Sequence, residues 1–219
     1  VLYLKKTRER LQSVLYDDED WHRAPLNYRV TGGPIHRKKY DIYLLAYESL
    51  PGLWVTSNLY VPNFVSFPVP GIIAVSDHAG GGKVSDYNQR MGIAFASLGY
   101  VTMVIDSPDR GELIGGNDHF INGAQMALTG LWSNSLFVIN AIRAIDYLQS
   151  RIDLIDLGKI GMTGTSGGGA TTLAAVAIDD RITAAAACCC VEPLSQCLFS
   201  GYTSCPEYMV PGGLILPLE

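Results

Sequence analysis

The chain has 219 residues, of which 48% are hydrophobic and 17% charged, and its formal net charge at pH 7 is −5. This length and apolar content suffice for one globular domain with a sizeable core, or for most of a larger one. The negative charge excludes the electrostatic footprint of a protein that binds nucleic acid or an anionic membrane surface. No apolar run approaches the roughly 20 residues needed to cross a bilayer, so no membrane span is predicted.

The N-terminal part of the chain predicts one helix followed by antiparallel strands. Residues 1–15 place leucines among basic and polar neighbours at helical spacing, which predicts an amphipathic helix in an N-terminal extension covering residues 1–25. Between residues 38 and 62, two β-rich runs, YDIYLLAY and LWVTSNLYV, are separated by Pro51-Gly52. This pattern predicts a turn between two antiparallel strands.

The remainder of the chain alternates short apolar runs with amphipathic segments. The expected elements are strand 71–75, helix 87–98, strand 101–105, helix 133–149, strand 159–163, helix 168–178 and strand 182–191. Nearly continuous apolar runs are typical of strands that are buried on both faces. The alternation therefore predicts an α/β fold: a mostly parallel central sheet with helices on both faces and an antiparallel N-terminal hairpin.

One short stretch has the pattern of a nucleophilic serine. Gly164-Thr165-Ser166-Gly167-Gly168 reads G-x-S-x-G where an expected strand gives way to an expected helix. In such a nucleophile elbow the backbone passes close to itself, so the positions two before and two after the serine must be small. The free N–H groups that begin the helix would point at the reaction centre, which makes Gly167 a candidate oxyanion-hole donor. A glycine-rich phosphate-binding turn is the competing interpretation, but the spacing fits neither a Rossmann motif nor a P-loop.

A second glycine-rich segment directly follows the expected strand at 71–75. Residues 78–82 read HAGGG, which looks like the HGGG-type loop that supplies the other oxyanion donor in esterases. The chemistry requires two backbone N–H groups about 3 Å from the developing alkoxide. We assign the second donor to Gly80. His78 is interpreted as a residue that holds the shape of this loop rather than as a proton carrier.

These two motifs, the stretch GYVTMVIDSPDRGE between them and DDRI at 179–182 resemble the α/β-hydrolase superfamily. Within it, the chain is similar to the acetyl xylan esterase-like, dienelactone hydrolase-related branch, from about Leu53 onward. The resemblance implies a serine carboxylic-ester hydrolase of the acetyl esterase or deacetylase type that acts through an acyl-serine intermediate. It implies a small-molecule ester substrate, with acetylated carbohydrate as a candidate, and no metal or organic cofactor. It also favours a bacterial periplasmic or secreted location, which the residues themselves do not specify.

The chain departs from the superfamily pattern in its triad. In α/β-hydrolases the acid and the histidine follow the nucleophile, but all four histidines of this chain precede Ser166. Asp179 and Asp180 end the helix that begins at the serine, about 16 Å away, so neither can be the acid. We therefore expect residues 1–219 to form a single α/β-hydrolase domain that is incomplete at its C-terminus. The missing strands, acid and histidine would come from a C-terminal remainder, on a second chain or in a missing segment.

Three alternatives remain open from the sequence. If the base lies upstream of Ser166, His119 and His78 are the candidates. The chain would otherwise be a non-catalytic α/β-hydrolase-like binding protein that kept the elbow and lost the triad. A serine peptidase or amidase on the same fold is the third alternative, because the motifs define the reaction class and not the substrate.

The sequence does not predict a metal site. The five cysteines show no C-x-x-C spacing, and Cys188-Cys189-Cys190 are interpreted as small buried hydrophobic residues. The acidic loop after strand 101–105 does not match a calcium-binding loop. We interpret it, through Asp106 with Arg110 and Glu112, as a salt-bridged rim of the active site.

Overall fold

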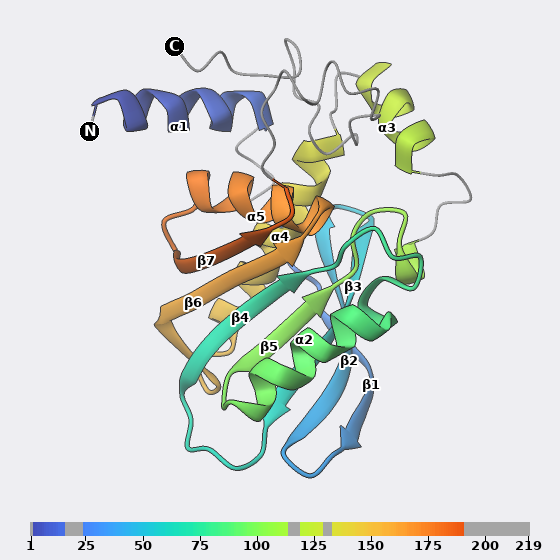
Figure 1. Ribbon diagram of the computed structural model, residues 1–219, viewed down its shortest axis with the longest axis vertical. Coiled ribbons are helices and arrows are strands. Elements are labelled where there is room, and N and C mark those ends of the chain that lie inside the picture. The colour runs from blue at the N-terminus through green and yellow to red at the C-terminus, as the bar shows by residue number, and fades with distance from the viewer. Residues whose placement is uncertain (1, 16–23, 114–118, 129–132, 191–219) are drawn as a thin grey trace.

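The computed structural model describes residues 2–15, 24–113, 119–128 and 133–190 (Figure 1). These residues form one seven-stranded sheet with the strand order β1-β2-β3-β5-β4-β6-β7. The strands are β1 (Arg29–His36), β2 (Tyr40–Leu50), β3 (Leu53–Pro62), β4 (Val69–Val75), β5 (Val101–Ile105), β6 (Ile155–Thr165) and β7 (Ile182–Cys188). The helices are α1 (Leu2–Leu15), α2 (Asp86–Ser97), α3 (His119–Leu128), α4 (Ser133–Ser150) and α5 (Gly167–Ile178), with 3-10 turns η2 (Gly82–Val84) and η3 (Gly111–Leu113).

The sheet has an antiparallel part and a parallel part. β1, β2, β3 and β5 pair antiparallel in that order, whereas β5, β4, β6 and β7 pair parallel. The predicted hairpin is β2–β3, and Gly52 in its turn has a φ of +80°, a conformation that glycine adopts readily. The predicted α/β fold is confirmed. The antiparallel part is larger than expected because β1, which was not predicted, extends the hairpin at the sheet edge.

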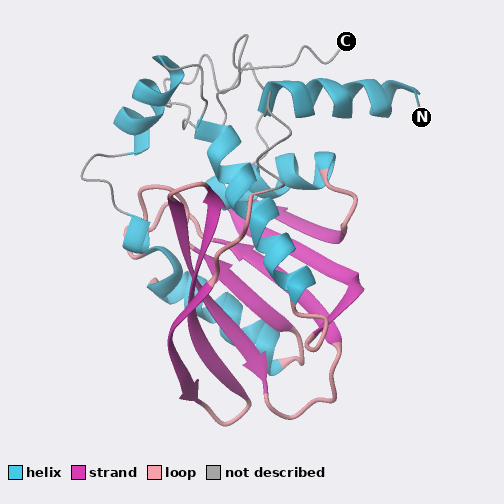
Figure 2. Ribbon diagram, turned by 180° about the vertical axis from the view of Figure 1, so that it is seen from behind, coloured by secondary structure: helices cyan, strands magenta, loops and turns pink. Residues whose placement is uncertain are grey.

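Helices cover both faces of the sheet, as predicted. α2 packs on β3 and β5 on one face, and α4 and α5 lie together on the other (Figures 1 and 2). The larger core lies between α4, α5 and the sheet, where Ile73, Met103 and Ile145 are inaccessible to solvent. The smaller core, beneath α2, surrounds Tyr60. The sheet is therefore a rigid platform on which the ends of the strands can position a site.

The predicted N-terminal helix, α1, packs against α5. Arg8 Nε donates a hydrogen bond to the carbonyl oxygen of Ala177 (2.9 Å), and Gln12 Nε2 donates to that of Ile178 (3.3 Å). The last carbonyl groups of a helix lack partners within the helix. α1 therefore caps the C-terminal end of α5. No helix in the described ranges is long and apolar enough to span a membrane.

β7 is the last strand of the sheet, as predicted, and among the described residues it pairs only with β6. Its residues from Thr183 to Ala186 are exposed. An apolar strand with one unpaired edge is a template for pairing with a further strand. The strand ends at Cys188, and the prediction that the three adjacent cysteines are all buried is wrong for two of them: Cys190 is buried, but Cys188 and Cys189 are exposed.

Candidate active site

Ser166 occupies the sharp turn between β6 and α5, as the motif predicts. Its φ and ψ are 57° and −119°, a conformation that residues other than glycine rarely adopt. Strained backbone of this kind concentrates at functional sites. Two backbone hydrogen bonds hold the turn: the Ser166 N–H donates to the Cys188 carbonyl oxygen (2.9 Å), and the Ala170 N–H donates to the Ser166 carbonyl oxygen (2.9 Å).

The glycines on either side of Ser166 allow this turn to form. A Cβ atom on Gly164 would lie well inside 3.0 Å of the Gly168 carbonyl group, and a Cβ atom on Gly168 would lie equally close to the Val75 carbonyl oxygen. Backbone atoms cannot move away from such an overlap as a flexible side chain can. The requirement for small residues at both positions, inferred from the motif, is therefore met by direct backbone contacts.

The imidazole of His78 lies against the serine hydroxyl. His78 Nδ1 is 2.7 Å from Ser166 Oγ, although the two residues are 88 positions apart. An imidazole that carries its proton on Nε2 accepts the hydroxyl hydrogen in this geometry, which is the relation of a general base to its nucleophile. The interpretation of His78 as a loop anchor alone is therefore incomplete. His119 begins α3, and its side chain lies outside the described residues.

The HAGGG loop connects β4 to η2 and is held at its start by Asp77. Asp77 Oδ1 accepts hydrogen bonds from the Ala79 N–H (3.1 Å) and from Asn88 Nδ2 (3.0 Å). Asn88 Nδ2 also donates to the Gly82 carbonyl oxygen (2.8 Å). The Ala79 N–H is thus engaged, whereas Gly80 is exposed and its N–H donates to no partner in the described part of the chain.

A crevice too narrow to admit a water molecule lies beside Ser166. Its wall includes His78, Arg110, Phe137 and Gly167, the first residue of α5. The first N–H groups of a helix have no partner within the helix, and the helix dipole makes this end partly positive. The imidazole ring and the positive end of α5 therefore border the same space. This arrangement suits a reaction in which negative charge develops beside the serine.

A buried ion pair lies at the end of β5, directly behind the HAGGG loop. Asp106 is fully buried, and Lys83 Nζ is 2.5 Å from Asp106 Oδ2. Lys83 Nζ also contacts the carboxylate of Glu112. The predicted salt bridge of Asp106 therefore exists, but it differs in two respects: the cation is Lys83, which no sequence pattern indicated, and Asp106 is buried. In the described ranges no three His, Cys, Asp or Glu side chains come together as ligands for a metal ion.

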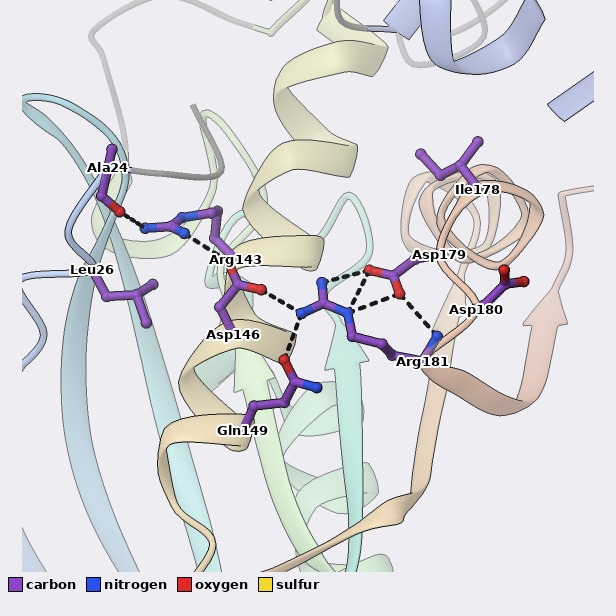
Figure 3. Close-up of a pocket in the computed structure, with 9 residues that line it drawn as sticks. All are labelled: Ala24, Leu26, Arg143, Asp146, Gln149, Ile178, Asp179, Asp180 and Arg181. Atoms are coloured by element: carbon purple, nitrogen blue, oxygen red, sulfur yellow. Dashed lines mark hydrogen bonds and ion pairs between the residues drawn. The ribbon is translucent and has the colours of Figure 1, made fainter. Parts of the chain in front are cut away.

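A larger cavity, of about 620 Å³, lies at the opposite end of α5 (Figure 3). Arg181 pairs with Asp146 and with Asp179 at 2.6 Å each, and Asp146 also pairs with Arg143 at 2.6 Å. These charges neutralise one another. The 12 residues of α5 separate this cavity from Ser166 by about 18 Å. The cavity is therefore no part of the serine site, and Asp179 is excluded as the catalytic acid, as expected.

The mixed sheet, the strand–turn–helix elbow and the glycine-rich loop after β4 together define an α/β-hydrolase fold. The acetyl xylan esterase (AXE1) family model matches residues 18–195. The chain belongs to the acetyl xylan esterase family. The match begins well before Leu53, where the resemblance was expected to start. No curated protein sequence matches the chain at a significant level.

Solved structures give the same fold. A candidate acetyl xylan esterase from Bacteroides fragilis is 16% identical with a TM-score of 0.73, and the match covers 84% of this chain and 51% of that one. Methylesterase BT1017 is 24% identical with a TM-score of 0.72, and the match covers 97% of this chain and 46% of that one. The acetyl xylan esterase from Paenibacillus sp. R4 is 20% identical with a TM-score of 0.63, and the match covers 84% of this chain and 57% of that one. The chain thus spans about half the length of the structures it matches.

Proposed function

We propose that this chain carries the nucleophile of a serine carboxylic-ester hydrolase that removes acetyl groups from carbohydrate. The observation that carries the proposal is Ser166 Oγ, held in a strained elbow at the start of α5 and 2.7 Å from His78 Nδ1. Membership of the acetyl xylan esterase family supports ester chemistry. The same membership supports a bacterial periplasmic or secreted location, which fractionation of the producing cells would test.

In the proposed mechanism, Ser166 Oγ attacks the ester carbonyl carbon while a base removes the hydroxyl proton. The N–H groups of Gly167 and Gly80 stabilise the tetrahedral oxyanion. The intermediate collapses, the alcohol leaves with the proton, and the acyl group remains on Ser166. Water, activated by the same base, then attacks the acyl-serine and releases acetate. No metal or organic cofactor is required for this sequence of steps.

The base is proposed to come from a C-terminal remainder of the domain that contributes an acid, a histidine and strands beyond β7. Among the described residues β7 pairs on one side only, and this edge together with the half-length coverage of the solved neighbours supports the proposal. His78 would then orient the serine hydroxyl. The 219-residue chain by itself should retain only the residual catalysis of its oxyanion hole and substrate binding. Full activity in this chain that disappears in His78→Ala would instead assign the base to His78.

The test uses a fluorophosphonate probe together with hydrolysis of p-nitrophenyl acetate and acetylated xylan. The complete protein should be labelled at Ser166, and Ser166→Ala should lose labelling and at least about 10⁴-fold in kcat. Ser150→Ala, at the exposed end of α4, is the matched control and should keep both the labelling at Ser166 and the wild-type kcat. A folded protein that binds acetylated oligosaccharide without labelling or turnover would instead be a binding protein. Preference for amide substrates over esters would identify a peptidase or amidase.

A further inference from the structure

We propose that Lys83 and Asp106 form a positioning pair that fixes the Gly80 peptide in line with the oxyanion. The inference rests on the proposed ester hydrolysis, in which the Gly80 N–H is an oxyanion donor. Neither side chain would touch the substrate. Their effect on the reaction would pass through the backbone of the HAGGG loop.

Asp106 gathers hydrogen bonds from separate segments of the chain. Its Oδ1 accepts the Lys83 N–H at 2.6 Å, and its Oδ2 accepts the Thr56 hydroxyl of β3 at 2.7 Å. The Glu112 N–H lies 3.4 Å from Oδ2. The Lys83 side chain returns to the same carboxylate, with Nζ 2.5 Å from Oδ2. One buried carboxylate therefore ties the end of the HAGGG loop to the sheet and to the loop after β5.

The backbone around Asp106 is closed by two glycines in left-handed conformation. Gly82 has a φ of +52° and Gly111 a φ of +59°, and a Cβ atom on either would overlap the Asp106 carboxylate. The Gly111 N–H donates to the Gly80 carbonyl oxygen at 3.1 Å. Gly80 is thus connected to Asp106 through Gly111 on one side and through residues 82 and 83 on the other.

Stability alone does not explain a charged pair at this place. The Lys83 side chain is 4% exposed and that of Asp106 is 0% exposed. The desolvation of such a pair commonly offsets its Coulombic attraction, and apolar residues of similar volume often stabilise a fold as well. A charged pair with several hydrogen bonds does, however, fix orientation. Nζ of Lys83 also contacts the exposed Glu112, which ties η2 to η3 and stiffens the loop further.

Loss of the pair should therefore act on the transition state. Without the Lys83 ammonium group, the Asp106 carboxylate loses its counterion, and residue 83 loses one of its two hydrogen bonds to that carboxylate. The Gly80 N–H then no longer points at the oxyanion. Because the oxyanion exists only in the transition state, binding of the ground-state ester should be little affected. A displacement of about 1 Å in such a donor can cost up to about 10²-fold in rate.

The experiment compares Lys83→Met with the wild-type complete protein. Wild type must first show Ser166-dependent hydrolysis; if it does not, the proposed function fails and this inference fails with it. In an active protein, Lys83→Met should lower kcat for p-nitrophenyl acetate at least tenfold and leave KM within about twofold. Its affinity for a trifluoromethyl ketone that forms an oxyanion adduct with the serine should fall by the same factor as kcat/KM. Thermal unfolding reports the change in stability separately.

Arg143→Met is the matched control, because Arg143 is also a buried cation paired with an aspartate, Asp146, but at the other end of α5. It should lower the melting temperature without changing kcat or the affinity for the ketone. If Lys83→Met does not fold, Lys83→Met with Asp106→Asn removes both buried charges and keeps an oxygen acceptor for the backbone N–H of residue 83. This double variant should also show the selective loss of kcat. Unchanged kcat and ketone affinity in a folded Lys83 variant, or an equal selective loss in Arg143→Met, would overturn the proposal.

Discussion

The two ends of α5 differ in the size of the adjacent cavity and in the charged side chains around it. At its N-terminal end, glycine backbone packs closely around Ser166, and the crevice beside it is too narrow to admit a water molecule. At its C-terminal end, a much larger cavity is lined by arginine and aspartate side chains that neutralise one another. The proposed nucleophile lies at the end with little space and strained backbone. In this molecule the strained backbone therefore marks the candidate site, whereas cavity size does not.

The largest effect on stability and kcat is expected from adding a single methyl group at the N-terminal end of α5, where the backbone packs closely. Gly164→Ala places a Cβ atom against the Gly168 carbonyl group, so the elbow must shift. We expect a loss of about 3 kcal/mol in the free energy of unfolding and a fall in kcat of several orders of magnitude. The measurements are urea denaturation and ester hydrolysis.

Gly161→Ala is the matched control for Gly164→Ala on the same strand. The nearest atom to its new Cβ would be the Ala184 carbonyl oxygen at 3.6 Å, an ordinary van der Waals contact. This variant should keep the wild-type kcat, and its free energy of unfolding should fall by less than about 1 kcal/mol. Equal effects of the two substitutions would contradict the view that close backbone contact shapes the nucleophile turn.

An intermediate effect is expected from removing one N–H group at the same end. Gly80→Pro deletes the donor proposed for the oxyanion and should reduce kcat by about 10²-fold with little change in KM. Gly80→Ala keeps the N–H, and its Cβ atom has no neighbour within 4 Å. Its kcat should therefore fall much less than that of Gly80→Pro. If both variants lose the same amount, or if Gly80→Pro raises KM alone, Gly80 is not the oxyanion donor.

The smallest effect on catalysis is expected at the far end of α5. Asp146→Asn removes the carboxylate shared by Arg143 and Arg181. Breaking this largely buried network should lower the free energy of unfolding by about 2 kcal/mol. The kcat of the folded variant should stay within twofold of wild type. A clear loss of kcat in a fully folded variant would mean that the two ends are coupled through α5.

The sequence predicted those features that depend on residues close together in the chain. The elbow follows from five consecutive residues, and each core strand from a short apolar run. β1 was missed because RVTGGPIH contains two glycines and a proline, which argue against a strand. The structure tolerates them because β1 is an exposed edge strand with register shifts in its pairing to β2.

The side-chain partners in the candidate site were not predictable in the same way. His78 and Ser166 meet across 88 positions, and Lys83 and Asp106 across 23. Lysine is almost always solvent-exposed, so nothing in the sequence indicates that Lys83 is buried. Both contacts arise because parallel strands bring the loops after β4, β5 and β6 to one edge of the sheet. That proximity is a property of the topology and not of any local pattern.

The amide proton of Ser166 is held by an edge strand. Its acceptor is the carbonyl oxygen of Cys188, the last residue of β7. Such a proton exchanges with solvent deuterium only when its hydrogen bond opens. The exchange rate of this one amide therefore measures how often the end of β7 separates from the turn that holds the serine. Any strand that pairs with the edge of β7 opposite β6 should slow that exchange, so such pairing can be followed at the amide of Ser166.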